Sequence, residues 1–427
     1  MRYTVAAAAA LATMSACADQ ASAPTFDTGD PAPDAAGNTA ASSVTVASQA
    51  AVAAMLPLDA PGDFEQARRG LVASDPNLVV KSKTGVVIWD MPAYSFIESE
   101  SAQASVNPSL WRQARLNDIH GLFEVVPGIH QLRGHDLANM TLIEGETGWI
   151  VVDPLTAEET AARAIAFARE HLGDKPVAAI IFTHSHVDHF GGVLGVVSAE
   201  EVAERSIPII APKGFLAAAT SENILAGVTM GRRSGYMYGA RLPRNERGHV
   251  GSGLGKGPAY GRIGILPPTI TISETPTEHT IDGVKFTFQY APDSEAPAEL
   301  TFYLPELDVF CGAEVVSHNM HNVYTLRGAK VRDALLWAGY IDEILQMFGT
   351  AKVYFGSHHW PIWGNERVVD FLTKQRDMYK YIHDQSLRLA LLGYTPREIA
   401  ETIELPEQLQ KSFPNRGYYG TLSHNSK

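Results

Sequence analysis

Residues 177–192 read VAAIIFTHSHVDHFGG, and this stretch decides the fold. Its first half is a continuous apolar run of the kind that forms a buried strand. Its second half places His184, His186, Asp188 and His189 just past the end of that strand. Imidazole and carboxylate groups are the usual ligands of zinc in proteins. Four such groups in so short a segment exceed what one ion readily takes, so we predict a site for two adjacent metal ions.

The alternative for this segment is a histidine-rich surface turn that binds no metal. Histidines do not collect at a strand end around an aspartate by composition alone, so the metal interpretation is preferred. Gly191 and Gly192 follow the cluster and permit a tight turn of the backbone beneath it.

Strands and helices alternate on both sides of this segment, which predicts a layered α/β domain. Residues 139–144 and 148–153 are typical of a hairpin, and 157–172 of a helix with an Ala and Leu face. Residues 251–264 (GSGLGKGPAYGRIG) are dense in glycine but follow no strand, so we expect a mobile loop and not a phosphate cradle. We expect further strands at 207–211, 270–273, 284–290, 300–304, 309–312 and 352–356, and helices at 330–348 and 366–392.

Composition and charge exclude several classes of protein. The 427 residues are 45% hydrophobic and 19% charged, which is ordinary for a globular chain. With 34 Lys and Arg against 47 Asp and Glu the formal charge is −13, so we expect no nucleic-acid partner. The two cysteines, Cys17 and Cys311, exclude a disulfide scaffold. No apolar run reaches the roughly 20 residues that a membrane helix needs.

The N-terminus is typical of an export signal. Arg2 precedes a short apolar run rich in alanine, and small residues then lead to Cys17. We therefore expect a signal peptide over residues 1–23. It is either a lipoprotein signal, with a lipid on Cys17 tethering the protein to a membrane, or an ordinary one cleaved nearby. The mature protein is then periplasmic or an outer-membrane lipoprotein. Residues 24–58 have the composition of a linker.

The element HxHxDH within THSHVDHFGG is the hallmark of the metallo-β-lactamase superfamily, which this chain resembles. It is more closely similar to one branch, the zinc-dependent alkyl sulfatases. The resemblance implies an αβ/βα sandwich with the metal site at one edge, and it runs from about residue 60 to the last residue. The stretches that carry it are NPSLWRQARLNDIHGLFEVVPGIHQLRG (107–134), NMTLIEGETGWIVVDPLT (139–156), SENILAG (221–227), SEAPAE (294–299), HNVYTLRGAKVRDA (321–334) and HHWPIWGN (358–365).

The resemblance implies two glutamates as further ligands. Glu295, in SEAPAE, takes the place of a histidine used elsewhere in the superfamily and completes the first zinc with His184 and His186. Glu299 is the rival position. Glu314, in CGAE, bridges both ions where relatives usually carry an aspartate.

The second zinc is implied to lie between Asp188, His189 and a histidine near the C-terminal end of the domain. That histidine is His358, with its neighbour His359 as the alternative. Asp153, at the end of GWIVVD, is interpreted either as a carboxylate that orients a ligand histidine or as a simple strand-end cap.

Zinc has no accessible second oxidation state and lowers the pKa of bound water, which favours hydrolysis over redox chemistry. The resemblance implies that the substrate is an alkyl sulfate ester, split into an alcohol and inorganic sulfate. Trp360 and Trp363, beside the last ligand, are expected to pack the floor of the site.

A sulfate monoester needs cations and hydrogen-bond donors. Arg327 offers a fork for two sulfate oxygens, Asn322 offers an amide hydrogen, and Tyr260 is a third candidate. His424 is the candidate proton donor to the leaving group. The alternatives are a structural ion pair for Arg327, a turn role for Asn322 and a surface position for His424. The catalytic candidates are therefore Asp188, Arg327, Asn322 and His424.

The domain organisation also follows from the resemblance. We expect a catalytic domain over 59–374 and the beginning of a helical dimerisation domain over 375–427. Relatives continue beyond that point with the rest of this domain and a lipid-carrier-like domain, so we expect a C-terminally truncated form. We expect a homodimer for the full-length form.

Two other functions remain open at this stage. One is a different hydrolase on the same fold, namely a lactonase, thioesterase, phosphodiesterase or β-lactamase. The other is a non-catalytic, metal-binding exported fragment. Glu295 and Glu314 weigh against the first, and the complete ligand set weighs against the second.

Overall fold

The computed structural model describes residue 35, residues 37–99 and residues 102–427. The expected signal peptide and Cys17 lie outside the described residues. Within the described ranges, no helix combines the length and the apolar character that crossing a bilayer requires.

The first of two large sheets contains the strand that precedes the histidine-rich turn. Its spatial order is β1-β4-β5-β6-β7-β8-β9-β10, with antiparallel pairs up to β7 and parallel pairs from β7 to β10. The strands are β1 (Leu71–Ala73), β4 (Gly121–Val126), β5 (Ile129–Arg133), β6 (Met140–Glu144), β7 (Trp149–Val152), β8 (Val177–Ile181), β9 (Ile209–Pro212) and β10 (Ile270–Ile272).

The second sheet follows in sequence and has the order β11-β12-β13-β14-β15-β16. Its pairs are antiparallel except for β14 and β15, which run parallel. The strands are β11 (Thr277–Ile281), β12 (Val284–Tyr290), β13 (Leu300–Leu304), β14 (Val309–Cys311), β15 (Val353–Phe355) and β16 (Ile362–Trp363).

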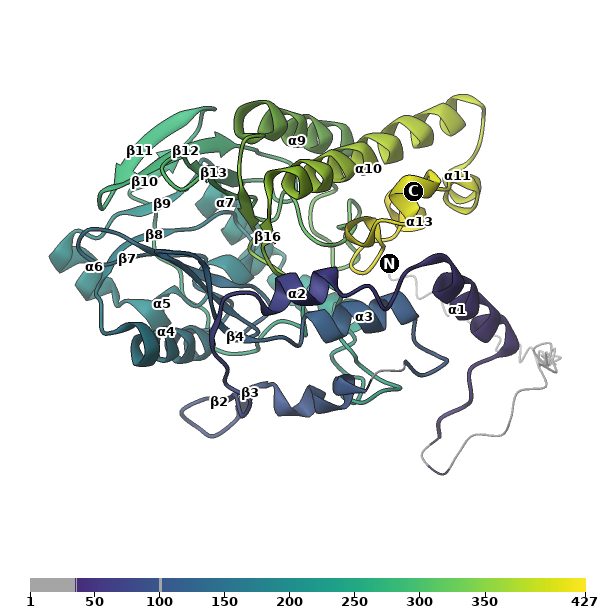
Figure 1. Ribbon diagram of the computed structural model, residues 1–427, viewed down its shortest axis with the longest axis horizontal. Helices are drawn as coiled ribbons and strands as arrows, with labels where there is room; N and C mark the ends of the chain where they lie inside the picture. Colours follow the sequence, from purple (N-terminus) through teal and green to yellow (C-terminus); the bar gives the residue numbers. More distant parts are fainter. Residues whose placement is uncertain (1–34, 36, 100–101) are drawn as a thin grey trace, which may run out of the picture.

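The two sheets pack face to face, with helices on both outer faces. Ile150 and Ile181 of the first sheet share a buried cluster with Phe302 and Phe355 of the second. Figure 1 shows helices α4 (Glu158–Leu172) and α5 (Val193–Val196) beside the first sheet, and α9 (Ala334–Phe348) and α10 (Asn365–Leu391) beside the second. Separate apolar clusters seal each helical layer. The expected αβ/βα sandwich is confirmed.

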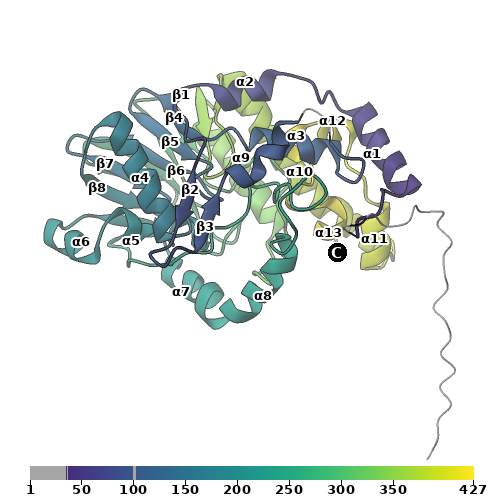
Figure 2. The same ribbon diagram turned by 90° about the horizontal axis from the view of Figure 1, so that it is seen from below.

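An arm of three short helices leaves the body after β9. It consists of α7 (Phe215–Thr220), the π-helix η3 (Ser221–Leu225) and α8 (Gly227–Met237). Figure 2 shows α7 and α8 protruding below the sheets. The remaining elements are α1 (Ser43–Met55), α2 (Gly62–Arg68), β2 (Val79–Lys81), β3 (Val87–Asp90), η1 (Pro92–Glu98), α3 (Pro108–Leu116), η2 (Val187–His189), α6 (Ala199–Arg205), α11 (Pro396–Thr402), α12 (Glu407–Gln410), η4 (Phe413–Asn415) and α13 (Leu422–Asn425).

Most elements expected from the sequence form within one or two residues of their predicted ends, but three segments differ. The helix expected from residue 330 begins at Ala334, because the Asp333 side chain caps it by accepting hydrogen bonds from the N–H groups of Leu335 and Leu336. The expected linker holds helix α1, which buries no side chain. It forms because it is rich in alanine and because the Ser42 hydroxyl accepts a hydrogen bond from the Thr45 N–H at 3.2 Å.

The glycine-dense loop 251–264 is packed against the body, so the expectation of a mobile loop is wrong. The Ala259 N–H donates to the Asp136 carboxylate at 3.2 Å. The Gly264 N–H donates to the carbonyl of Gly191, beside the histidine-rich turn, at 2.7 Å. The loop therefore forms a wall of the site and does not hang free over it.

Helix α10 runs through the expected domain boundary at residues 374 and 375 without a break. Gln375 is fully buried, and its amide donates to the carbonyl of Pro414 at 2.7 Å. The C-terminal segment thus packs onto a helix that also covers the second sheet.

Candidate metal centre and substrate cleft

The candidate ligands come from the ends of strands in both sheets. The histidine-rich turn follows β8, Glu314 follows β14, and His358 follows β15. Glu295 lies in the loop between β12 and β13. These segments, which are far apart in the sequence, therefore place their ligand side chains together at one edge of the sandwich.

The first ligand set contains His184, His186, Glu295 and Glu314. The Glu295 Oε2 atom lies 2.8 Å from Nδ1 of His186 and 3.5 Å from Nε2 of His184. The same His184 nitrogen lies 3.3 Å from Oε2 of Glu314. All four side chains are buried.

The second ligand set contains Asp188, His189, His358 and, again, Glu314. The Glu314 Oε2 atom lies 3.2 Å from Nε2 of His189 and 3.0 Å from Nε2 of His358. Asp188 completes the set with its Oδ2 atom 3.2 Å from His189 and 3.6 Å from His358. All seven side chains predicted from the sequence thus meet in one place, with Glu314 common to both sets.

The donor atoms fit metal ions. The Nε2 atoms of His184 and His189 and the Oε2 atom of Glu295 are buried, and none has a hydrogen-bond partner among the described residues. Buried polar atoms of this kind are costly unless a ligand satisfies them. The donor atoms of each set lie within 4.8 Å of one another, as the ligands of one ion do.

Glu314 is ionised at the junction of the sets. Burial disfavours its charge, but His358, His184 and His189 hold its pKa well below the ordinary value. A charged carboxylate between two sets of imidazoles is the group that a pair of cations would share.

Asp153, at the end of β7, orients the second set. Its Oδ2 atom lies 2.9 Å from Nδ1 of His189, leaving Nε2 to face the ligands. Thr183 and Ser357 donate hydroxyl hydrogen bonds to the same carboxylate, each at 2.7 Å. Burial opposes its charge, but His189 keeps its pKa below the ordinary value. The orienting interpretation therefore fits better than a strand-end cap.

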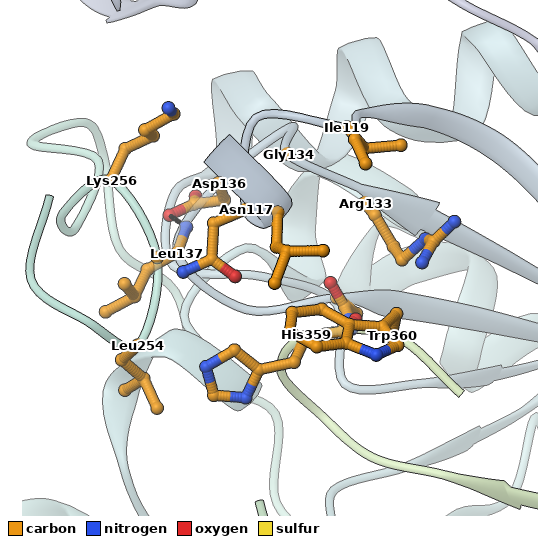
Figure 3. Close-up of a pocket in the computed structure, with 13 residues that line it drawn as sticks. Asn117, Ile119, Arg133, Gly134, Asp136, Leu137, Leu254, Lys256, His359 and Trp360 are labelled. Carbon is orange, nitrogen blue, oxygen red and sulfur yellow. Dashed lines mark hydrogen bonds between the residues drawn. The ribbon is translucent and has the colours of Figure 1, made fainter. Parts of the chain in front are cut away.

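His358, and not His359, faces the ligands. The Nδ1 atom of His358 is hydrogen-bonded to the carbonyl of Leu137 at 3.1 Å, which turns Nε2 toward Glu314. The ring of His359 turns away, with Nε2 3.1 Å from the carbonyl of Gly253. Figure 3 shows His359 lining a separate cavity with Asn117, and that cavity measures about 30 Å³.

Glu299 is the support for Glu295 and not its substitute. Its carboxylate accepts hydrogen bonds from the N–H groups of Glu295 and Ala296, at 3.0 and 3.1 Å, and from the N–H of Glu314 at 3.3 Å. Burial and the neighbouring Glu295 raise the pKa of Glu299 to about 7. It therefore fixes the backbones that carry both glutamate ligands.

Sequence reasoning missed two residues that contact the glutamate ligands. Arg332 donates from Nη2 to Oε1 of Glu295 at 2.5 Å. The Nε2 atom of His321 lies 3.1 Å from Oε1 of Glu314 and 3.3 Å from Oε1 of Glu295. Both residues lie in the quoted stretch 321–334, but nothing in its spacing assigns them contacts.

A cleft of about 380 Å³ opens beside the first ligand set. Arg327, His186, Asp188 and Tyr260 are among the residues that line it. Burial opposes the charge of Arg327, but Tyr238 and the other neighbours raise its pKa, so the guanidinium remains a cation. It donates to the Tyr419 hydroxyl at 3.4 Å, a contact that sequence reasoning missed.

Asn322 lies near the ligands with its amide unsatisfied. Its Oδ1 atom accepts hydrogen bonds from Thr325 and Arg332, and its Nδ2 atom is buried without a partner among the described residues. The amide is therefore an unused donor, although Asn322 is not among the residues that line the cleft.

Three other candidates lie elsewhere. The ring of His424 stacks on Tyr324 at 6.2 Å, and no contact joins it to either ligand set. Trp363 is part of the core between the sheets, where its indole N–H donates to the carbonyl of Val125 at 2.9 Å. Trp360 packs on His318 with ring centres 4.3 Å apart, and neither tryptophan lines the cleft.

Fold and site together define a candidate metal centre at the edge of an αβ/βα sandwich. A family model described as the metallo-beta-lactamase superfamily matches residues 133–358, and a second, described as alkyl sulfatase dimerisation, matches residues 395–427. The chain belongs to the metallo-beta-lactamase superfamily.

Named relatives narrow the similarity to one branch. The chain is 48% identical to a linear primary-alkylsulfatase of Pseudomonas sp., over 91% of this chain and 58% of the relative. It is also 48% identical to the alkyl/aryl-sulfatase BDS1 of Saccharomyces cerevisiae, over 88% of this chain and 58% of the relative. The solved structure of the inverting sec-alkylsulfatase Pisa1 of Pseudomonas sp. is 43% identical, with a TM-score of 0.88, over 91% of this chain and 61% of that chain. This chain thus spans about three fifths of the length of these relatives.

Proposed function

We propose that this protein hydrolyses alkyl sulfate esters to an alcohol and inorganic sulfate, using two zinc ions. The observation that carries the proposal is the pair of ligand sets that share Glu314 beside a cleft lined by Arg327. Relatives named alkylsulfatases, at 44–48% identity, support the choice of substrate.

Zinc fits the donor set because all donors are imidazole or carboxylate groups. His184, His186 and Glu295 would hold one ion and Asp188, His189 and His358 the other, with Glu314 between them. When bound, such ions activate water and stabilise a developing negative charge. The protein itself keeps the ligand side chains in position and binds the ester beside them.

The charge of the cleft suits a sulfate group. Arg327 is a permanent cation with two donor edges, and Asn322 keeps a buried N–H pair free. Arg327 therefore orients the anionic head of the substrate from within the cleft, whereas the free amide of Asn322 lies outside the residues that line it.

The rest of the cleft suits an alkyl chain. Val187, Met230, Pro258 and Ile263 line it alongside the polar groups. Burial of an alkyl tail there gains roughly 0.8 kcal/mol per methylene removed from water. The affinity for the ester should therefore rise with chain length until the cleft is filled.

The decisive assay compares sulfate release from dodecyl sulfate with turnover of a lactone, a thioester, a phosphodiester and a β-lactam. We expect turnover of the sulfate ester to exceed that of every other compound by at least about 100-fold, or about 2.7 kcal/mol in transition-state binding. Preferential turnover of another ester would assign a different hydrolase activity. Zinc-loaded protein that turns over none of them would be a non-catalytic binding protein.

We further propose that the protein is exported and forms a homodimer. The leader composition of residues 1–23 supports export, with Cys17 as the lipid attachment point in the tethered form. The match to an alkyl sulfatase dimerisation model supports the homodimer. Fractionation of expressing cells and sedimentation of the purified protein test the two proposals; a cytoplasmic protein or a monomer would refute them.

A further inference from the structure

Glu222 lies in the cleft at the point where the arm meets the metal centre. It belongs to the π-helix η3, and such π-turns often occur at functional sites. Its side chain is 12% exposed, and one oxygen, Oε2, lies 3.5 Å from Nε2 of His186 and 3.8 Å from Nη2 of Arg327. One carboxylate therefore stands between a metal ligand and the cation of the cleft.

The two ring nitrogens of His186 face different groups. Nδ1 lies 2.8 Å from the ligand oxygen of Glu295, inside the first set. Nε2 points the other way, toward Glu222, and it is buried without a hydrogen bond among the described residues. A histidine that binds metal through one nitrogen carries its proton on the other, and that N–H usually donates to a carboxylate or carbonyl.

The second set already shows this arrangement in the bonded form. There the Asp153 carboxylate is hydrogen-bonded to Nδ1 of His189 at 2.9 Å, and Nε2 of His189 is left to bind the metal. Glu222 is placed in the same way beside His186, except that here the carboxylate faces Nε2 of the ring and Nδ1 faces the ligand set. Unlike Asp153, Glu222 also lines the cleft, and Arg327 lines the same cleft.

We propose that Glu222 is a positioning residue that fixes the ring of His186 for metal binding and holds Arg327 in place for the anionic head of the substrate. The role in metal binding depends only on the ligand set, whereas the role toward substrate rests on the proposed sulfatase function. The same carboxylate therefore positions both the metal ligand His186 and the substrate-binding cation Arg327.

Two substitutions separate the two contacts. Glu222→Ala removes both, and we expect zinc affinity, measured by competition with a chelator, to fall about 10- to 100-fold. Glu222→Gln keeps an acceptor for the His186 N–H but loses the charge facing Arg327. We expect its zinc affinity to stay within about threefold of the parent protein while kcat/KM for an alkyl sulfate falls about tenfold.

Ser221→Ala is the matched control, because Ser221 is exposed in the same π-helix and does not line the cleft. It should leave both quantities unchanged. Glu222→Ala with parental zinc affinity would overturn the proposal, as would equal losses of zinc in Glu222→Ala and Ser221→Ala. If the parent protein binds zinc but splits no sulfate ester, the proposed function fails while the zinc comparison still decides the role of Glu222 toward His186.

Discussion

The two ligand sets share Glu314 but are supported in different ways. In the second set Asp153, which follows β7, orients His189, and the carbonyl of Leu137, in the loop between β5 and β6, orients His358. In the first set the Thr183 hydroxyl lies 2.9 Å from Nδ1 of His184, and Arg332 is bonded to Glu295. Asp153 therefore supports the second set directly and the first only through Thr183, whereas the first also depends on Arg332 and on the arm that forms the cleft.

Metal removal should have the largest effect, because it affects both sets at once. Without cations the carboxylates of Asp188, Glu295 and Glu314 repel one another, so bound metal stabilises the fold. Zinc at 1,000 times its dissociation constant adds about 4.1 kcal/mol per site. We expect a chelator to abolish turnover and to lower the melting temperature by more than about 5 °C in calorimetry. An unchanged melting temperature and full turnover would refute both sets.

Arg332→Met should destabilise the first set next most strongly. It leaves Glu295, which is 1% exposed, without its buried cation, and breaking such a pair costs about 3–5 kcal/mol. Chemical denaturation of the zinc-free protein measures this loss. The matched control is Lys330→Met, because Lys330 is 74% exposed and its ion pair with Asp293 is long, at 3.7 Å. Equal stabilities of the two variants would contradict the assigned support.

Asp153→Asn tests the second set. Asparagine tolerates the positive φ of 54° at this position, so the substitution removes charge with little backbone strain. We expect zinc affinity of the second set to fall about 10- to 100-fold in titration calorimetry, and that of the first set to fall less, because Asp153 reaches His184 only through Thr183. Asp308→Asn, at a φ of 53° in an exposed turn, should change neither. A loss confined to the first set would reverse the comparison.

The smallest predicted effect is a pH dependence of stability that comes from buried histidines outside both ligand sets. Burial lowers the pKa of His135 and of His318 from 6.5 to about 4. The unfolded chain therefore binds more protons between these values, and stability falls as the pH drops below 6.5 toward 4. Each should cost about 1 kcal/mol of unfolding free energy between pH 7.5 and 5.5. His135→Leu should remove its share in urea unfolding at the two pH values; an unchanged difference would contradict this assignment.

The histidine-rich turn supplies two ligands to each set, and it could be predicted because it follows a strand with a strong apolar pattern. Asp153 could be singled out for the same reason, since it follows β7. Sequence alone also placed β12 and β13 at their observed ends. The resemblance supplied Glu295, Glu314 and His358, which no local spacing indicates.

The missed groups share one physical feature. Arg332, His321 and Tyr419 lie in segments without regular periodicity, and their contacts depend on how distant loops pack. Glu222 was visible only as part of SENILAG, with no signal that it approaches His186. The loop 251–264 was misjudged because its glycines suggest mobility, while its anchors, Asp136 and Gly191, lie more than 70 residues away in the sequence.

The most direct test of the shared carboxylate is the zinc content and sulfate release of Glu314→Ala beside the parent protein. We predict two zinc ions per chain in the parent. In the variant we predict affinity reduced by more than about 100-fold at both sites and no measurable sulfate release, because Glu314 is the ligand common to both sets. A variant that keeps two zinc ions and parental turnover would contradict the account.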